Sequence, residues 1–386
     1  MAQKIILKGI AWDHPRGYEP LRATSEVFEK KYPKVRIEWD IRSLKEFGDM
    51  PIEDLIGRYD LLTIDHPYMG QAHENKLLLS LEDRLLAPYL DKLSKASIGP
   101  SFSSYFYEDK LYALPIDAAA LVAAARSDLL EQFKLTLPTY RADLFDFYKK
   151  IPSPYRVAWP LCATDLWCAF LSLGTQDAGK GFIHNYKIEE KTGAIILDEL
   201  KRHLDFIHPE SIHWNPIQLL DQMAANDEII YAPFLFGYTN YARRNYAKKI
   251  IHFSNSPSNP ATNISTIMGG VGLAVSTQCQ YPAWALAYLA YVADPKTQRT
   301  IYTQFGGQAA TKTAWEDAIN NKLCHNFFKD TLATMENVYV RPQHPAWNIF
   351  QEEGAALLHR GLMEDRSSEI LMKELNALYQ TIEYAI

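Results

Sequence analysis

The sequence has little that marks a catalyst, a metal protein or a membrane protein. Its 386 residues include only four cysteines, Cys162, Cys168, Cys279 and Cys324, which form no CxxC pair and no zinc-binding spacing. No run approaches the roughly 18–20 apolar residues of a membrane-spanning helix. The motifs GxSxG, HExxH, GxxxxGK with Ser or Thr, and the EF-hand loop are missing as well. We therefore expect buried free thiols, no metal, no cofactor and no enzymatic step.

Charge and spacing argue against further classes. The formal net charge of -6 disfavours a surface for nucleic acid or anionic membranes. His203, His208 and His213 recur every five residues, and five helical residues turn the chain by about 500°, so their side chains point apart. The glycines at 269–272 do not form GxGxxG, because Val275 stands where the last glycine belongs. These patterns predict neither a metal-binding face nor a dinucleotide loop.

Aromatic side chains, by contrast, are abundant. The chain contains 23 Tyr, 17 Phe and 8 Trp within an ordinary globular composition of 47% hydrophobic and 22% charged residues. Most of these rings must lie in cores, because large rings carry much of the apolar burial. A minority could stack on a planar or sugar ligand. The length suggests two or three domains.

The N-terminal part alternates strands and helices. The patterns predict strands at 5–11, 35–41 and 60–64, with a helix from about Tyr18 that ends before Pro33. Such alternation implies a mostly parallel α/β sheet. Ligands bind outside the carboxyl ends of the strands in such sheets.

Two polar clusters follow these strands. Trp12-Asp13-His14 follows the first strand, and Asp65-His66-Pro67 follows the third. Each aspartate could cap the next helix beside a solvated histidine, and we weigh that interpretation equally with ligand contact. For the two loops as a unit, we favour a ligand site.

The segment 107–130 compresses a turn, a strand, a bend and a helix. Residues 107–110 predict the turn and residues 111–114 a short strand. Pro115 then biases the backbone out of any sheet ladder. The small-residue run 118–125 leads into Arg126–Leu130.

Later segments predict a second group of strands and helices. A strand at 158–161 precedes an apolar helix capped by Thr164 or Asp165. A strand at 229–232 precedes an aromatic loop at 233–238. A glycine-led strand at 269–276 and helices at 282–293, 347–361 and 367–385 complete the pattern.

The order of these motifs resembles the extracellular solute-binding proteins (family 1) of ABC importers, the group that includes maltose- and oligosaccharide-binding proteins. The similarity covers nearly the whole chain, and its most specific part is the series GGVGLAVS…PAWALAYLAYVADPKTQRTIYTQFGGQAA from residue 269. It implies an α/β, two-lobed periplasmic-binding-protein-like fold of type II, with the ligand cleft between the lobes. Lobe 1 would comprise 1–115 and 268–312, and lobe 2 would comprise 116–267 and the closing helices 313–386.

The resemblance also implies transport. A protein of this family captures a small solute, a carbohydrate by family default, by hinge closure, and delivers it to a permease and an ATPase. It would act as a monomer, without nucleic acid, in the periplasm or outside the cell. Because the first twenty residues lack the pattern of a signal peptide, a cytoplasmic location stays open.

The expected ligand site follows from the chemistry of sugars, whose rings offer an apolar face to aromatic planes and a hydroxyl rim to carboxylates. Aromatic planes would come from Trp12, Trp167 and the loop 233–238, and acceptors from Asp13, Asp65 and Asp117. A core position for Trp167 is the alternative, only slightly less favoured. The full set of candidate ligand-binding residues is Trp12, Asp13, His14, Arg16, Asp65, His66, Asp117, Trp167, Phe234, Phe236, Tyr238, Gly270 and Arg341.

Two other hypotheses stay open. His14 and Arg16 beside Trp12 suit a carboxylate or sulfate, so a small organic acid or another anion is an alternative ligand. A solvated Arg16 at a helix entry is the simpler interpretation and ranks first. The alternative of another class is a cytoplasmic enzyme or sensor that reuses the fold.

Overall fold

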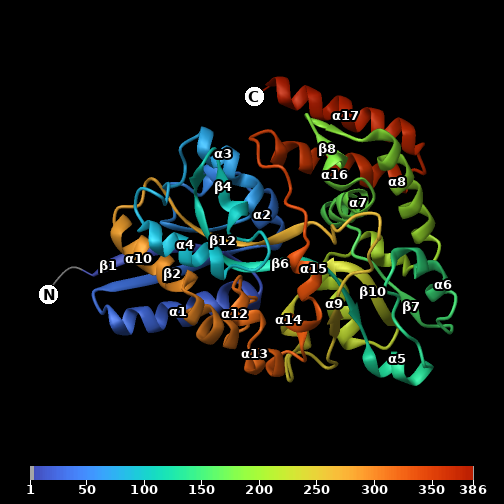
Figure 1. Ribbon diagram of the computed structural model, residues 1–386, viewed down its shortest axis with the longest axis horizontal. Coiled ribbons are helices and arrows are strands. Elements are labelled where there is room, and N and C mark those ends of the chain that lie inside the picture. The colour runs from blue at the N-terminus through green and yellow to red at the C-terminus, as the bar shows by residue number, and fades with distance from the viewer. Residues whose placement is uncertain (1–3, 386) are drawn as a thin grey trace. The chain divides into compact units, whose positions relative to one another are not determined.

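A computed structural model describes residues 4–385, without the side chains of residues 49 and 383–385. The chain forms two compact units (Figure 1). Unit 1 consists of the chain up to Ala119, Gly269–Leu323 and Arg341–Pro345. Unit 2 consists of Ala120–Met268, Cys324–Val340 and the chain from Ala346 onward.

The boundaries of the units differ from the predicted lobe boundaries in three main places. Residues 313–323, expected among the closing helices of lobe 2, belong to unit 1. The chain also returns to unit 1 for the short segment Arg341–Pro345, which no pattern in the sequence indicated. The first crossing, between Ala119 and Ala120, falls slightly later than the predicted boundary after residue 115.

Unit 1 is built on a sheet whose first strands are parallel. Strand β1 pairs in parallel with both β2 and β3, and β12 pairs antiparallel with β3 and lies next to β6 in the strand order. Strands β1 and β3 were predicted from short apolar runs and β2 from the alternation of apolar and polar residues. Strand β3 is buried along its whole length, as expected of a strand covered on both faces. The strands are β1 (Ile5–Trp12), β2 (Val35–Arg42), β3 (Leu61–Ile64), β4 (Phe106–Tyr107), β5 (Lys110–Leu111), β6 (Ala113–Ala125, which crosses into unit 2) and β12 (Met268–Val275).

Helix α1 packs on this sheet and on α10 through one apolar stripe. Phe28 of α1 lies edge-on to Tyr288 of α10, with ring centroids 5.3 Å apart. The helices of unit 1 are α1 (Pro15–Lys31), α2 (Leu44–Asp49), η1 (Ile52–Asp54), η2 (His66–Tyr68), α3 (Met69–Glu74), α4 (Ala87–Ala96), η3 (Ser103–Tyr105), α10 (Pro282–Ala293), α11 (Pro295–Thr297), η8 (Gln298–Tyr302), α12 (Lys312–Trp315) and α13 (Ala318–Leu323).

Unit 2 has a smaller sheet around the second half of β6. Strands β10 and β11 each pair antiparallel with β6, and β7 pairs in parallel with β10. The strands of this unit are β7 (Arg156–Val157), β8 (Ile183–His184), β9 (Lys187–Ile188), β10 (Ile229–Phe236) and β11 (His252–Ser254).

Helix α7 is the buried helix of unit 2, packed against α8 and α16. It is apolar nearly all round, as a core helix must be. The helices of this unit are α5 (Ser127–Phe133), η4 (Arg141–Asp143), α6 (Leu144–Tyr148), α7 (Ala163–Ala178), η5 (Gly179–Phe182), α8 (Glu190–Leu204), η6 (Pro209–Ile212), α9 (Pro216–Ala225), η7 (Thr239–Ala242), α14 (Phe327–Asp330), α15 (Leu332–Glu336), α16 (Trp347–Met363) and α17 (Ser368–Ala385).

Two predictions about prolines are wrong. Pro115 does not end a strand, because β6 runs unbroken from Ala113 to Ala125. An extended backbone accommodates the fixed φ of proline, and only one ladder donor is lost. The predicted loop 233–238 is mostly strand, since β10 continues to Phe236. An irregularity in its register between Ala232 and Leu235 absorbs Pro233.

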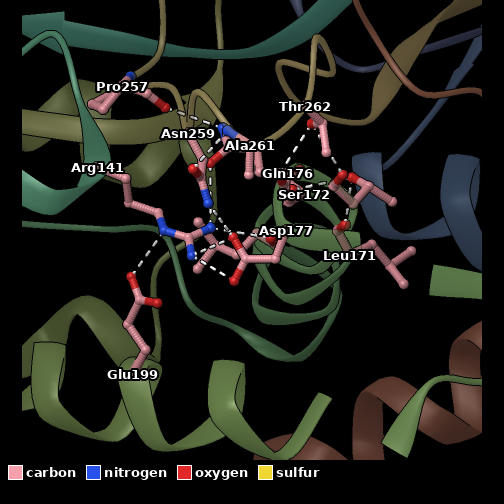
Figure 2. A network of polar contacts seen from close by, with 12 residues as sticks. Arg141, Leu171, Ser172, Gln176, Asp177, Glu199, Pro257, Asn259, Ala261 and Thr262 are labelled. Atoms are coloured by element: carbon pink, nitrogen blue, oxygen red, sulfur yellow. Dashed lines mark hydrogen bonds and ion pairs between the residues drawn. The ribbon is translucent and has the colours of Figure 1, made fainter. Parts of the chain in front are cut away.

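A polar network ties the helices of unit 2 together. Figure 2 shows the guanidinium of Arg141 between the carboxylates of Asp177 and Glu199. The Nη2 atom of Arg141 donates to Oδ1 of Asp177 at 2.6 Å, and the amide of Asn259 donates to the same oxygen at 2.6 Å. Because every charge in this network has an opposite partner, we regard it as a structural clamp on η4, α7 and α8.

None of the four cysteines forms a disulfide within the described residues. Cys168 and Cys324 are buried, whereas Cys162 and Cys279 are partly exposed. Within residues 4–385, no helix combines the length and the apolar character needed to cross a membrane.

Candidate functional site

Three strand ends meet at one edge of the unit 1 sheet. Because β1, β2 and β3 are parallel, their last residues, Trp12, Arg42 and Ile64, lie at the same edge, with Trp12 opposite Arg42 in the register. Both predicted polar clusters follow directly from this edge. It is the place where ligands bind in open α/β sheets.

Trp12 lies in the core of unit 1. Its side chain is 3% exposed, and its ring packs 5.4 Å from that of Phe47. A Cβ atom on Gly17 would come within 2.5 Å of the same ring, so α1 approaches Trp12 closely. Trp12 therefore packs beneath the sheet edge as a core residue. Its stacking on a ligand stays a prediction.

His14, and not Asp13, caps helix α1. Its Nδ1 atom accepts a hydrogen bond from the backbone N–H of Arg16 at 3.0 Å. Burial, and then the nearby Arg16, lower the pKa of His14 to about 3, so its ring is neutral at neutral pH. Asp13 is exposed. The capping interpretation, with a capping aspartate and a solvated histidine, is wrong for this loop.

Arg16 and Asp117 form a buried ion pair. The Nε and Nη2 atoms of Arg16 donate to Oδ2 and Oδ1 of Asp117 at 2.9 and 2.5 Å. Arg16 is 4% exposed and Asp117 is fully buried. Burial raises the pKa of the Asp117 carboxyl, and the Arg16 guanidinium opposes that shift. The interpretation of Arg16 as a solvated charge is therefore wrong, and its fork already holds a carboxylate.

Asp65 and Arg341 form a second ion pair. Oδ1 of Asp65 accepts the backbone N–H of His66 at 2.8 Å, and Oδ2 accepts from Nη2 of Arg341 at 2.5 Å. Burial raises the pKa of Asp65, but Arg341 and His66 outweigh it and hold that pKa below its usual range. His66 is fully buried, so it is not solvated, and burial lowers its pKa. Asp65 thus caps η2 and carries a paired negative charge.

Tyr105 is buried close enough to both ion pairs for their charges to act on its phenol. Burial raises the pKa of its phenol well above the usual value, and the carboxylates of Asp65 and Asp117 add to that shift. Its hydroxyl has no hydrogen-bond partner among residues 4–385. No pattern in the sequence singles out Tyr105, which is one of several aromatics in a segment without periodicity.

Gly270 allows β12 to approach this cluster. Its φ is +123°, and a Cβ atom there would lie 2.5 Å from the backbone oxygen of Asp117. The role that the structure shows for Gly270 is this close backbone approach. Direct contact of Gly270 with a ligand stays a prediction.

The predicted aromatic residues of unit 2 are mostly buried. Trp167 is 0% exposed and packs against Phe170, Trp347 and Phe350, which is the core position weighed as the alternative. Phe234 packs against Trp159, with ring centroids 5.1 Å apart.

The last residues of the predicted aromatic loop differ in exposure. Tyr238 is 5% exposed, whereas Phe236 is partly exposed. Of the predicted aromatic planes in unit 2, Phe236 therefore keeps the most accessible ring.

Asp165, which the sequence suggested only as a helix cap, is a further candidate for the site. The N-cap of α7 is Cys162, and Asp165 lies in the first turn, 9% exposed. Its Oδ2 atom accepts from the thiol of Cys162 at 3.1 Å, and no basic side chain among the described residues pairs with it. Burial raises the pKa of Asp165 to about 7. The feature of the sequence that could have indicated this candidate is a carboxylate in the first turn of an otherwise apolar helix.

No group of three or more His, Cys, Asp or Glu side chains within residues 4–385 is arranged to hold a metal ion. The cluster in unit 1 instead consists of two arginine–carboxylate pairs and a phenol. Such a cluster offers hydrogen-bond donors and acceptors with little net charge.

The comparisons with known proteins give the class. The family of bacterial extracellular solute-binding proteins matches residues 52–323, which is most of the chain. The chain therefore belongs to this family. No curated protein matches the sequence.

Solved structures agree over almost the full length. The maltose-bound MalE3 of T. maritima is 14% identical, with 99% of this chain and 100% of that chain covered and a TM-score of 0.82. A solute-binding protein of Agrobacterium radiobacter K84 in complex with ribitol is 16% identical, covers 98% and 99%, and has a TM-score of 0.85. The GacH receptor of Streptomyces glaucescens, solved unliganded and with acarbose, is 15% identical, covers 98% of both chains and has a TM-score of 0.80. The predicted two-lobed periplasmic-binding-protein-like α/β fold is confirmed.

Proposed function

We propose that the protein is the substrate-binding component of an ABC importer and captures a carbohydrate or polyol. Membership of the extracellular solute-binding family supports the role. The proteins of similar fold carry maltose, ribitol, acarbose and, in a protein of Agrobacterium vitis S4, D-mannitol. The observation that carries the choice of solute is the pairing of both acidic residues of the cluster, Asp65 and Asp117, with arginines.

The chemistry of this cluster suits a neutral, polyhydroxylated solute. A carboxylate held by a guanidinium keeps lone pairs that accept sugar hydroxyls, and the charge-assisted bonds fix its orientation. Because a carboxylate neutralises the charge of Arg16 and another that of Arg341, neither arginine favours an anionic ligand. The anionic alternative based on His14 and Arg16 loses its basis, since the imidazole is neutral and the guanidinium is paired.

Partners and location follow from the same proposal. The protein would hand its solute to a membrane permease driven by an ATPase, in the periplasm or outside the cell, and would act as a monomer without a catalytic step. That the solute lies between two lobes which close around it stays a prediction of the family resemblance. The two carboxylates of the unit 1 cluster are held by arginines, so this cluster does not favour the enzyme or sensor alternative.

A thermal-shift screen with site variants tests the proposal. Ligand that binds only the folded state raises the melting temperature by mass action. Wild type should shift with at least one of maltose, tagatose, ribitol and mannitol. Asp65→Asn should lose most of that shift, because the amide offers one acceptor in place of two.

The matched control is Asp91→Asn, which changes an exposed carboxylate on α4 of the same unit. It should shift as wild type does. An equal shift in Asp65→Asn would remove Asp65 from the site. The absence of any shift in wild type would count against a carbohydrate or polyol solute.

A further inference from the structure

Arg42 is a buried cation that has no carboxylate partner among the side chains the structure describes. It is the last residue of β2 and is 7% exposed. Its Nη2 atom donates to the backbone oxygen of Thr63 at 2.9 Å, and its guanidinium lies 5.1 Å from the ring centroid of Phe47. Its Nε atom has no hydrogen-bond partner among residues 4–385, and no carboxylate described there lies within ion-pair distance.

Among the described residues, Glu46 is the acidic residue that interacts electrostatically with Arg42, but its carboxylate is hydrogen-bonded to Ser43. Its Oε2 atom accepts the backbone N–H and the hydroxyl of Ser43, at 2.7 and 2.9 Å, in the capping box of α2. Burial lowers the pKa of Arg42 to about 10, with Tyr68, Glu46 and Tyr59 opposing that shift. Arg42 therefore keeps its charge at neutral pH.

Arg42 lines a small, mostly apolar pocket in unit 1. Arg42 is the charged residue among the described lining residues, and the pocket has room for about one water molecule. The lining residues are Arg42, Phe47, Met50, Ile52, Leu55, Leu62, Thr63, Ile64 and Tyr68. A water bound to the Nε–H would still leave the buried charge without an opposite partner, which is costly.

We propose that this pocket binds a small anionic group against Arg42. Two sources supply that chemistry, a free halide ion such as chloride and the carboxylate of a solute acid. The size of the pocket favours a single atom, and hence the halide. The carboxylate source rests on the proposed function, because it makes Arg42 a determinant of solute class.

Arg42, and not Arg16, is then the residue of this sheet edge that binds an anion. The sequence suggested Arg16 for this task, but the Arg16 guanidinium holds Asp117. Arg42 pairs in register with Trp12, so it lies at the same edge as the predicted clusters. An uncompensated charge at this edge is a better anion site than a compensated one.

Thermal unfolding at constant ionic strength tests the proposal, with sodium chloride replacing sodium methanesulfonate. Wild type should gain on the order of 2 °C in Tm at a tenfold excess over the dissociation constant. Arg42→Gln should gain nothing. Arg36→Gln, an exposed arginine on the same strand, should gain as wild type does.

Parallel series with sodium glucuronate and with glucose separate the two sources. A shift with glucuronate, absent with glucose and lost in Arg42→Gln, would assign the pocket to a solute carboxylate. A chloride shift lost in Arg42→Gln would assign it to a free halide. A shift with neither anion in wild type, or shifts retained in Arg42→Gln, would overturn the proposal.

A second measurement covers the case in which Arg42→Gln does not fold. The chloride-35 NMR line of wild type should broaden with protein concentration and sharpen on addition of bromide or glucuronate. An unbroadened line, together with no glucuronate shift, would overturn the proposal. If these measurements overturn the anion site, the binding of neutral sugars, and thus the proposed function, is unaffected.

Discussion

Arg341 donates a hydrogen bond from Nη2 to Oδ2 of Asp65 at 2.5 Å, although 276 positions separate the two residues. Arg341 begins the short segment Arg341–Pro345 with which the chain returns to unit 1. The backbone N–H of Gly70 donates to the carbonyl of Gln343 at 2.9 Å and fixes the same segment. A late stretch of chain thus completes the candidate site of unit 1.

Arg341→Met should destabilise the protein by about 3–5 kcal/mol at neutral pH, because it leaves the Asp65 carboxylate partly buried without its partner. The folded-state pKa of Asp65 is held below its unfolded value of 3.8, so the pair stabilises the fold above that pH and loses its effect as pH falls. Urea unfolding of wild type and variant should therefore differ most near pH 7, and the difference should shrink as the pH falls from about 4 toward the folded-state pKa of Asp65. Arg36→Met, at an exposed position on β2, should change stability by less than about 1 kcal/mol. A difference that persists at low pH would contradict the ion pair.

Asp165→Asn should change the pH dependence of stability in the opposite sense. The folded-state pKa of Asp165 is raised from 3.8 to about 7, so its stabilising effect is complete below pH 3.8 and is lost as pH rises to about 7. The asparagine variant should equal wild type near pH 4 and exceed it at pH 8, by up to about 4 kcal/mol. Urea titrations at both pH values measure this difference, with the exposed Asp205→Asn as control. A variant that is less stable than wild type at pH 8 would show that the charged carboxylate stabilises the fold.

Trp167→Ala should cost about 3–5 kcal/mol, because it opens a cavity in the core of unit 2 beside Phe170, Trp347 and Phe350. Trp167→Phe keeps a ring and should cost less. Chemical unfolding gives both values. An alanine variant as stable as wild type, with weakened sugar binding, would restore the role as a ligand-stacking residue that the sequence predicted.

Gly270→Ala should destabilise the protein, since alanine disfavours a φ of +123° and its Cβ atom would clash with the backbone oxygen of Asp117. The matched control is Gly48→Ala in α2, where an added Cβ meets no atom within 4 Å. There alanine should be neutral or stabilising by a few tenths of a kcal/mol. A comparison of melting temperatures is sufficient. Equal effects of the two substitutions would contradict the close approach of β12 at Asp117.

The elements that depend on local pattern were predictable from the sequence. Strands β1, β2 and β3 and the helices α10, α16 and α17 follow from runs and periodicities that lie within a few residues. The prolines misled prediction because Pro115 and Pro233 lie in buried strands, where tertiary packing outweighs the loss of one backbone donor. Local signals could not report that packing.

The candidate site was predictable only in part. The two loops after β1 and β3 were identified, and Arg16, Asp117, Asp65 and Arg341 were all named as candidates, but their pairing was not predicted. The Arg16–Asp117 pair spans 101 positions and the Arg341–Asp65 pair spans 276, so no local pattern contains them. Arg42 was not singled out, and Asp165 was named only as a possible helix cap. What distinguishes both is burial without an opposite charge among the described residues, which only a folded structure reveals.

Isothermal titration calorimetry of the wild-type protein with maltose, tagatose, ribitol and mannitol tests most directly whether the protein binds a carbohydrate or polyol. We expect saturable binding of at least one of them, with one site per chain and an affinity that falls at least tenfold in Asp65→Asn. No heat from any of the four at millimolar concentration would contradict the assignment as a carbohydrate-binding or polyol-binding component of an importer.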